Sequence, residues 1–185
     1  MTEIVTNNDH IDVLHKIINN AEKFVIFACP FWYTQEHPEE AVFSVFDHDI
    51  EQALSRGVDI LFICNQDFIE RLQTYYRSLY IKYNKKIKVY SLDDFYTYSY
   101  STNLNFHGKI YINECDSLIT SQNITGLSRS LDIGVYTDEP ELYIEVVAWL
   151  GELLCRGEFY KQIQFENMMK GTLFGDYIQW YRNQH

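Results

Sequence analysis

The residues in this chain that are best suited to chemistry lie between positions 107 and 125. Apolar and polar residues alternate around His107 and Lys109, which predicts a strand carrying both side chains on one face. An imidazole can attack phosphorus or transfer protons near neutral pH, and a neighbouring ammonium suits a phosphate. The apolar run Leu118–Thr120 is followed by Ser121 and Asn123, whose side chains can donate hydrogen bonds to a phosphoryl oxygen.

This arrangement resembles the H-x-K-x4-D and G-S-x-N-x-T segments of the phospholipase D superfamily. His107 and Lys109 match the first segment, and Glu114 stands at its aspartate position. In the second segment Ser121 and Asn123 match the pattern, with a threonine in place of the usual glycine. A lone H-x-K would carry little weight, but the two segments in this order form a specific composite.

A third segment, Ser130–Val135, is similar to the N-x-E-x-G-V segment of the same superfamily. The resemblance places Asp132 where the superfamily keeps a carboxylate that orients the histidine. Thr120 is the residue at the glycine position of the second segment, and Asp116 lies two residues beyond the motif acid Glu114. The resemblance covers residues 104–136 well and the N-terminal half loosely.

The superfamily mechanism implied by this resemblance needs two histidines and no metal or other cofactor. One histidine attacks phosphorus, and the other protonates the leaving oxygen and then activates water. This chain carries a single H-x-K, so a two-fold dimer is expected to bring two His107 residues together. The residues expected to be catalytic are His107, Lys109, Ser121, Asn123 and Asp132.

Hydrophobic periodicity predicts an α/β domain in which strands and helices alternate. The resemblance adds a mixed central sheet with helices on both faces. Strands are expected at residues 24–29, 58–64, 87–91 and around His107, and helices at residues 11–18, 39–55, 68–79 and 140–157. Residues 93–105 read as a loop, and the aromatic tail 159–181 is interrupted by Gly171 and Gly175.

The length of 185 residues and the apolar fraction of 46% fit one globular domain, residues 1–185. The N-terminus shows no secretory signal and no apolar run is long enough to span a membrane, which favours the cytoplasm. The four cysteines form no C-x-x-C pair, so buried free thiols are favoured over zinc ligands or disulfides.

The formal net charge of −11 argues against a general polyanion binder, but the charge is unevenly distributed. Residues 71–88 contain no acidic residue, and tyrosines alternate with the basic residues there. This stretch could bind nucleic acid by contacting phosphates and stacking on unpaired bases. A helix with buried tyrosines and solvated cations explains it equally well. The candidate binding residues are Arg71, Arg77, Lys82, Lys85, Lys86 and Lys88.

Three functions fit these patterns. The first is a homodimeric, metal-independent phosphodiesterase acting on nucleic acid, most simply DNA. The second is a phosphodiesterase for phospholipid or another small diester, which predicts an apolar pocket near Phe31-Trp32-Tyr33. The third is a non-catalytic dimeric interaction module that keeps the fold, and the joint presence of His107, Lys109, Ser121 and Asn123 argues against it.

The sequence Asp47-His48-Asp49 joins three residue types that bind metals. Successive residues of a helix point about 100° apart and cannot converge on one ion. A solvated polar helix face is therefore the favoured explanation, and no metal site is expected.

Overall fold

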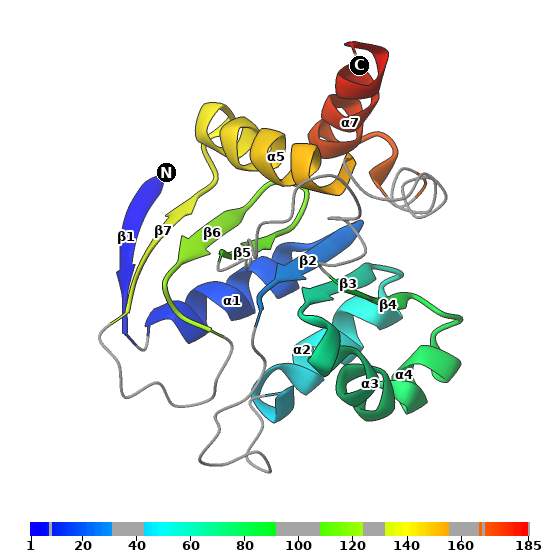
Figure 1. Ribbon diagram of the computed structural model, residues 1–185. Coiled ribbons are helices and arrows are strands. Elements are labelled where there is room, and N and C mark those ends of the chain that lie inside the picture. Colours follow the sequence, from blue (N-terminus) through cyan, green and yellow to red (C-terminus); the bar gives the residue numbers. More distant parts are fainter. Residues whose placement is uncertain are drawn as a thin grey trace.

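The computed structural model describes residues 1–7, 9–30, 43–91, 108–123, 132–155, 167 and 169–184. Seven strands and six helices are arranged along this part of the chain (Figure 1). Their bounds are β1 Thr2–Thr6, α1 Asp9–Asn20, β2 Phe24–Ala28, α2 Phe43–Ser55, β3 Asp59–Cys64, α3 Gln66–Tyr75, α4 Arg77–Lys82, β4 Ile87–Ser91, β5 Lys109–Ile112, β6 Ser117–Thr120, β7 Ile133–Thr137, α5 Pro140–Cys155 and α7 Leu173–Gln184.

All seven strands belong to one mixed sheet of order β1-β7-β6-β5-β2-β3-β4. The strands β2, β3 and β4 run parallel to one another, whereas β5, β6, β7 and β1 follow in antiparallel pairs. Because β5 is antiparallel to β2, the start of β5 lies beside the ends of β2, β3 and β4, on the same side of the sheet along the strand direction. The predicted α/β class with a mixed sheet is confirmed.

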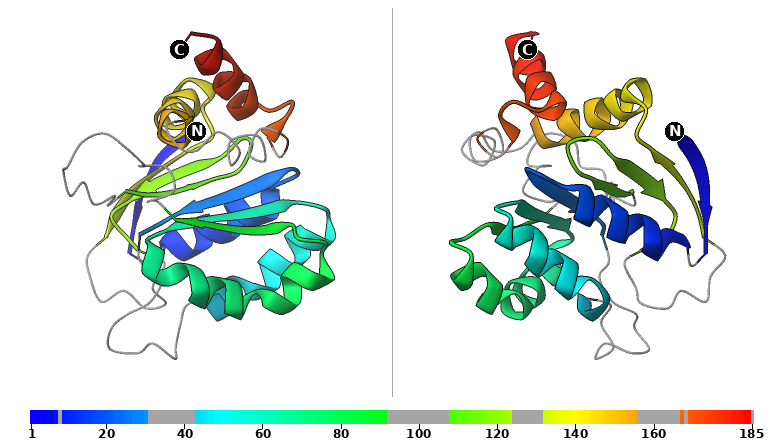
Figure 2. Two further views of the ribbon diagram at one scale, coloured as in Figure 1. Left: turned by 45° about the vertical axis from the view of Figure 1, so that its right-hand side comes forward. Right: turned by 180° about the vertical axis from the view of Figure 1, so that it is seen from behind.

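Helices cover both faces of the sheet, as Figure 2 shows. On one face α1, α2 and α3 pack over a core that includes Ile17, Ile50 and Leu72. On the other face α5 and α7 contribute Val147 and Phe174 to a second core. The strands between them are apolar on both sides, and β2 is buried at all five positions. Such continuous burial is typical of a sheet enclosed between two helical layers.

The predicted strands 24–29, 58–64 and 87–91 agree with β2, β3 and β4 to within a residue or two. The predicted helix 68–79 is divided at Tyr76 into α3 and α4, and Tyr76 is buried against the sheet. The strand β1 was not predicted, because Val5 alone is buried along it and its pattern is too weak. Gly175 does not interrupt the tail but lies within α7, where a Cβ would collide with the Met169 carbonyl.

A buried polar network holds the turn between β5 and β6. The Asn113 Oδ1 atom accepts the backbone N–H groups of Cys115 and Asp116, and its amide donates to the Ile17 carbonyl oxygen at 2.8 Å. The Asp116 carboxylate accepts the Tyr136 hydroxyl at 2.8 Å. These bonds tie the β5–β6 hairpin to α1 and β7 and so fix the strand that begins with Lys109. Among the described helices, none combines the length and the apolar character needed to cross a bilayer.

Candidate active site

Lys109 is the first residue of β5 and is only 2% exposed. Tyr111 faces the α1 side of the sheet, whereas Ile110 and Ile112 belong to the core on the opposite side. The expected alternation is therefore confirmed for the described part of this strand, which places Lys109 on the same face as Tyr111. His107 lies outside the described residues, and the described chain resumes at Gly108, directly before Lys109.

Burial dominates the electrostatics of Lys109 and lowers the pKa of its ammonium group, because desolvation disfavours the charged form. The ionised forms of Cys29 and Asp132 act in the opposite direction. A buried ammonium is poorly solvated, and water screens its charge less. Its electrostatic interaction with a neighbouring group is therefore stronger. A phosphate that reached it would therefore be bound more strongly than by a lysine on the open surface.

Ser121 and Asp132 are held together at the end of β6. The Ser121 hydroxyl donates to Asp132 Oδ1 at 2.9 Å and accepts the Ile133 N–H at 3.2 Å. The Ser121 N–H in turn donates to the Ile133 carbonyl oxygen at 3.0 Å. The proton of this hydroxyl is thus directed at Asp132, and the pair fixes the Asp132 carboxylate near Lys109.

Asn123 is held by a residue that the sequence reading did not assign to the site. Cys29, which follows β2, places its Sγ atom 3.6 Å from Asn123 Oδ1. A thiol is a weak donor, and this contact leaves the amide N–H₂ of Asn123 available to donate elsewhere. The Tyr111 hydroxyl donates to the Gln122 carbonyl oxygen at 3.2 Å and supports the same turn from beneath.

A second unassigned contribution comes from His10 in α1, which is 1% exposed. Its Nε2 atom lies 2.7 Å from the Thr120 hydroxyl oxygen, and its Nδ1 atom lies 2.8 Å from the Asn7 carbonyl oxygen. The same Thr120 oxygen accepts the Gln122 N–H at 3.0 Å. The helical spacing that His10 shares with Leu14 and Ile17 indicates that it is buried, but not that it contacts Thr120.

Glu114 is not part of this cluster. Lys109 begins β5, whereas Glu114 lies in the turn beyond Ile112, the other end of that strand. Its carboxylate accepts the backbone N–H groups of Lys23 and Phe24, each at 3.3 Å, and also that of Glu22. The motif acid therefore holds the entry to β2, and the structure brings together Lys109, Ser121, Asn123 and Asp132 without it.

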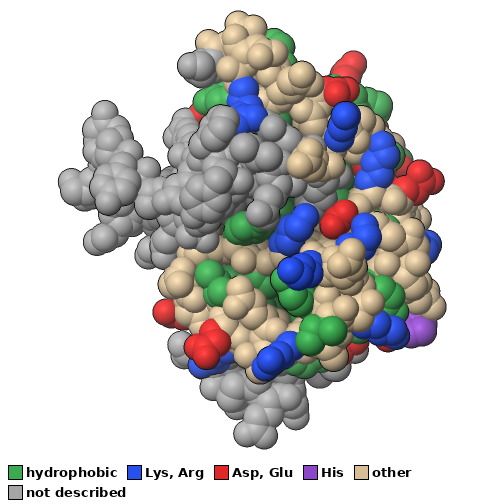
Figure 3. Space-filling view, turned by 90° about the vertical axis from the view of Figure 1, so that its right-hand side faces the viewer, with side chains coloured by type: hydrophobic (Ala, Val, Ile, Leu, Met, Phe, Trp, Pro, Cys, Tyr) green, Lys and Arg blue, Asp and Glu red, His purple; other side chains and the backbone are tan. Residues whose placement is uncertain are grey.

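The six basic residues of the 71–88 stretch do not form a single cluster of unpaired charges. Lys82 pairs with Glu51 at 2.6 Å. Lys86 and Lys88 both approach Asp59, at 3.4 and 3.7 Å. The other three, Arg71, Arg77 and Lys85, have exposed side chains. The surface around β4 nevertheless carries several Lys and Arg side chains near apolar ones (Figure 3).

The side chains of Asp47, His48 and Asp49 bond to three different neighbours. Asp47 accepts the hydroxyl of Tyr75, His48 contacts Gln52 at 2.8 Å, and Asp49 contacts His15. Over the residues that the structure describes, no group of three His, Cys, Asp or Glu side chains has a geometry suited to a metal ion. These residues act as separate helix-surface contacts.

The chain also matches a known protein family over most of its length. A family model described as "Cardiolipin synthase, PLD-like domain" matches residues 14–154. The chain belongs to the phospholipase D superfamily. The match begins within α1, ends within α5 and includes Lys109, Ser121, Asn123 and Asp132. Membership of this superfamily supports a phosphodiesterase or a related hydrolase activity.

Solved structures share the fold of this phospholipase D-like domain. NucT from Helicobacter pylori matches with a TM-score of 0.56 and 14% identity over 83% of this chain and 95% of its own. Nuc from Salmonella typhimurium, a phospholipase D family member, matches with a TM-score of 0.53 and 15% identity over 85% of this chain and 96% of its own.

The archaeal chromatin protein TrmBL2 is a larger protein with a similar domain. It matches with a TM-score of 0.57 and 13% identity over 85% of this chain, which spans 53% of the TrmBL2 chain. No curated protein sequence matches the phospholipase D-like domain described here. The identities are low, so these structures establish the shared fold.

Proposed function

We propose that this protein is a homodimeric, metal-independent phosphodiesterase that hydrolyses DNA through a phosphohistidine on His107. The observation that carries the proposal is the cluster formed by Lys109, Ser121, Asn123 and Asp132 at the edge of the sheet where β5 begins. A buried ammonium and an amide with its N–H₂ group available can hold two phosphoryl oxygens. His107 directly precedes this edge in the sequence.

In the proposed reaction an imidazole nitrogen of His107 attacks phosphorus, and the bond from phosphorus to the leaving oxygen breaks. His107 of the partner subunit protonates that oxygen. It then takes a proton from water, whose oxygen attacks the phosphohistidine and releases His107. Lys109 and Asn123 hold the charge that develops on the phosphoryl oxygens. The Ser121–Asp132 pair supplies a fixed carboxylate to orient an imidazole.

A dimer is supported by an exposed apolar surface on the α5 side of the sheet. Register places Ile4, Val135, Ile119 and Ile110 in one row across β1, β7, β6 and β5. The first three are 63%, 39% and 44% exposed. Contiguous exposed apolar residues of this kind mark interaction surfaces. The row lies on the α5 side of the sheet, on the face opposite the Lys109 side chain. A second copy seated there would cover the row and reach the catalytic cluster around the ends of the strands where β5 begins.

The same face also favours a second candidate function, hydrolysis of a phospholipid or another diester with an apolar group. A cavity of about 460 Å³ runs between α5 and the β5–β6–β7 part of the sheet. The surface that lines this cavity is almost wholly apolar. Gly108, which directly precedes β5, is one of the lining residues. An acyl chain could occupy the cavity. The sequence predicts an apolar pocket for this candidate near Phe31-Trp32-Tyr33, and these three residues lie outside the described residues.

One experiment tests the proposed chemistry. The purified protein is incubated with bis(p-nitrophenyl) phosphate, plasmid DNA and phosphatidylcholine vesicles in excess EDTA. We expect hydrolysis of the simple diester and of DNA, loss of both in His107→Asn, and a covalent phosphohistidine trapped by quenching without acid. Lys109→Ala and Asn123→Ala should each lose about 2–4 kcal/mol of transition-state stabilisation.

Other results would overturn the proposal. Complete inhibition by EDTA that magnesium restores would assign the phosphate chemistry to a metal. Wild-type turnover in His107→Ala would remove the histidine from the reaction. Hydrolysis of phosphatidylcholine with no cleavage of DNA would select the second candidate. A folded protein inactive on all three substrates would favour the interaction module.

A further inference from the structure

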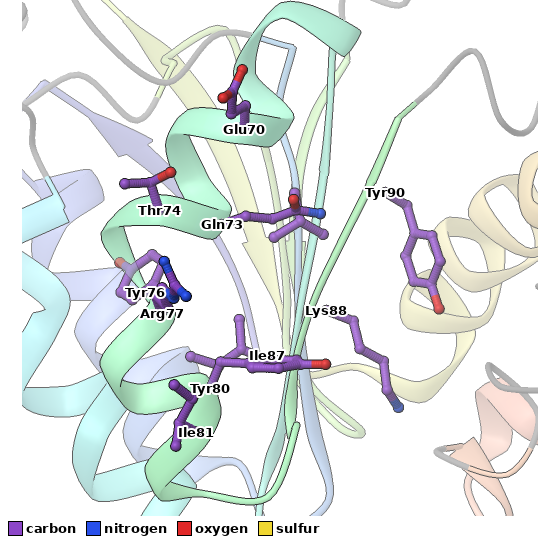
Figure 4. Close-up of a pocket in the computed structure, with 11 residues that line it drawn as sticks. Glu70, Gln73, Thr74, Tyr76, Arg77, Tyr80, Ile81, Ile87, Lys88 and Tyr90 are labelled. Carbon is purple, nitrogen blue, oxygen red and sulfur yellow. The ribbon is translucent and has the colours of Figure 1, made fainter.

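The outer edge of the sheet carries a groove that the catalytic cluster does not use. It has a volume of about 670 Å³ and lies between α3–α4 and the edge strand β4. Figure 4 shows the residues that line it. Those that matter here are Arg77 and Tyr80 from the helices, and Lys88 and Tyr90 from the strand.

The residues that line the groove place one cation and one tyrosine on each side of β4. Arg77 and Tyr80 come from α4, and Tyr80 extends toward β4 (Figure 4). Lys88 and Tyr90 project from β4 away from α3 and α4, toward the opposite face of the sheet, where Tyr90 packs against the second core. Tyr80 is 38% exposed, and Ile81 beside it is 69% exposed. A ligand that lay along β4 would thus meet an aromatic ring and a cation on each side of the strand.

We infer that this groove binds single-stranded nucleic acid, with phosphates on Arg77 and Lys88 and an unpaired base on Tyr80. Aromatic faces stack on any base, and cations track the backbone, so ring and cation together suit an unpaired strand. A duplex hides the faces of its bases and would gain only from the charges. The inference rests on the proposed nuclease function and specifies the form of its substrate.

Charge and position favour this ligand over another. The chain has a net charge of −11, yet residues 71–88 contain no carboxylate. Glu70 is the one acidic residue among the described residues that line the groove, so a polyanion meets more positive than negative charge there. The strand β4 is parallel to β2, and β5 is antiparallel to β2. Ser91 at the end of β4 therefore lies at the same end of the strands as Cys29 and Lys109. Three strand spacings, roughly 14 Å, separate β4 from β5. One strand of nucleic acid can reach both places.

The structure also limits the number of phosphates bound. Lys82 and Lys86 pair with Glu51 and Asp59 at 2.6 and 3.4 Å, and Lys88 lies 3.7 Å from the same Asp59 carboxylate. A phosphate bound at Lys88 would therefore compete with the longest of these three ion pairs. Two phosphate contacts, at Arg77 and Lys88, predict a slope of about −1.4 for the logarithm of affinity against the logarithm of salt concentration on a single strand. Removing one cation should bring this slope to about −0.7.

The test measures binding separately from cleavage. All variants carry His107→Asn, so that no strand is cut, and the probe is a fluorescein-labelled 12-nucleotide thymidine oligomer followed by anisotropy. We expect Tyr80→Ala to weaken binding about 5- to 150-fold and Tyr80→Phe to bind as the parent does, because the ring and not the hydroxyl stacks. Arg77→Ala and Lys88→Gln should each weaken binding and reduce the magnitude of the salt slope.

The matched control is Lys170→Ala, which removes one exposed positive charge near α7 and should leave binding unchanged. Thermal melting checks that every variant is folded. Equal binding by Tyr80→Ala and the parent would overturn the inference. So would tighter binding of a blunt duplex than of the single strand, or an unchanged salt slope in Arg77→Ala.

The two proposals can fail independently. If the groove variants lose single-strand binding as expected but the wild-type protein cleaves no phosphodiester, the groove assignment holds and the nuclease function falls. If the oligomer does not bind while bis(p-nitrophenyl) phosphate is hydrolysed in EDTA, the phosphodiesterase survives and the groove inference is wrong.

Discussion

The Thr120 hydroxyl oxygen lies 2.7 Å from Nε2 of the buried His10, and it also accepts the Gln122 N–H at 3.0 Å. Because His10 Nδ1 faces the Asn7 carbonyl oxygen, a neutral ring must donate from Nδ1 and accept at Nε2. The single Thr120 hydroxyl proton is then shared between His10 Nε2 and the Ile133 carbonyl oxygen at 3.3 Å, while the hydroxyl oxygen accepts the Gln122 N–H. Thr120 stands at the position where the superfamily carries glycine. Its side chain links α1 to the turn that presents Ser121 and Asn123.

Replacing Thr120 by valine keeps the shape of the side chain and removes the hydroxyl. His10 Nε2 and the Gln122 N–H each lose a buried partner, so we expect the free energy of unfolding to fall by about 1–3 kcal/mol. We also expect kcat to fall, because the turn carrying Asn123 loses its anchor. Urea denaturation and turnover of bis(p-nitrophenyl) phosphate measure the two effects.

Thr120→Ser retains the hydroxyl and should restore most of both quantities. If Thr120→Val kept the wild-type kcat while losing stability, the contact between Thr120 and His10 would be purely structural.

Gly134 lies against the contact between His10 and Thr120, so a larger residue at this position tests that contact sterically. A Cβ at this position would lie 2.9 Å from His10 Nε2, from the Ile119 carbonyl oxygen and from Thr120 Cβ. Gly134→Ala must push these groups apart, and overpacking of this kind costs about 1–3 kcal/mol. We expect a lower melting temperature together with reduced turnover. Gly57→Ala is a useful comparison, because Gly57 has positive φ and no atom within 4 Å of its added Cβ, so it perturbs the backbone without touching the site.

Much of the fold could be predicted because β2 and β3 are continuous apolar runs with clear ends. The positions of Lys109, Ser121, Asn123 and Asp132 also followed from motif spacing. The roles of Cys29 and His10 did not, because each looks like an ordinary core residue in its own segment. Only the pairing of β2 with β5, and the packing of α1 on β6, brings them to the motif residues. Such long-range contacts leave no local pattern in the sequence.

Lys109 allows activity and stability to be separated. Its pKa is lowered by burial, so the folded state binds this proton less tightly than the unfolded state does. The penalty is fully present at pH 7 and is relieved as pH rises through the lowered pKa toward 10.5, the ordinary pKa of a lysine. Lys109→Met removes the buried charge, so we expect a higher free energy of unfolding at pH 7 and a smaller gain at alkaline pH.

The same substitution should reduce turnover roughly 10²- to 10³-fold, as expected for loss of an oxyanion donor. Chemical denaturation at several pH values and steady-state kinetics provide both numbers. A less stable Lys109→Met protein would mean that the contacts of the ammonium outweigh its desolvation.

The apolar row across β1, β7 and β6 can be tested by placing a charge in its centre. Val135 is 39% exposed and is paired with Ile4 and Ile119. Val135→Lys should turn the dimer into a monomer in light scattering and remove activity with it, since a buried unpaired charge opposes association. Val45→Lys on α2 is the control, because Val45 is 41% exposed on the opposite side of the sheet. A monomeric Val45 variant or a dimeric, active Val135 variant would contradict this assignment of the interface.

A mixing experiment tests whether the two subunits share one reaction. Wild-type and His107→Asn chains are unfolded together in equal amounts and refolded, so that they pair at random. If each wild-type chain acts alone, activity should be about half that of an all-wild-type sample. If both His107 residues are required, only wild-type pairs are active, and random pairing leaves about a quarter. Because the proposed acid comes from the partner, we expect the lower value. A sample that keeps half the activity would show that each subunit completes the reaction by itself.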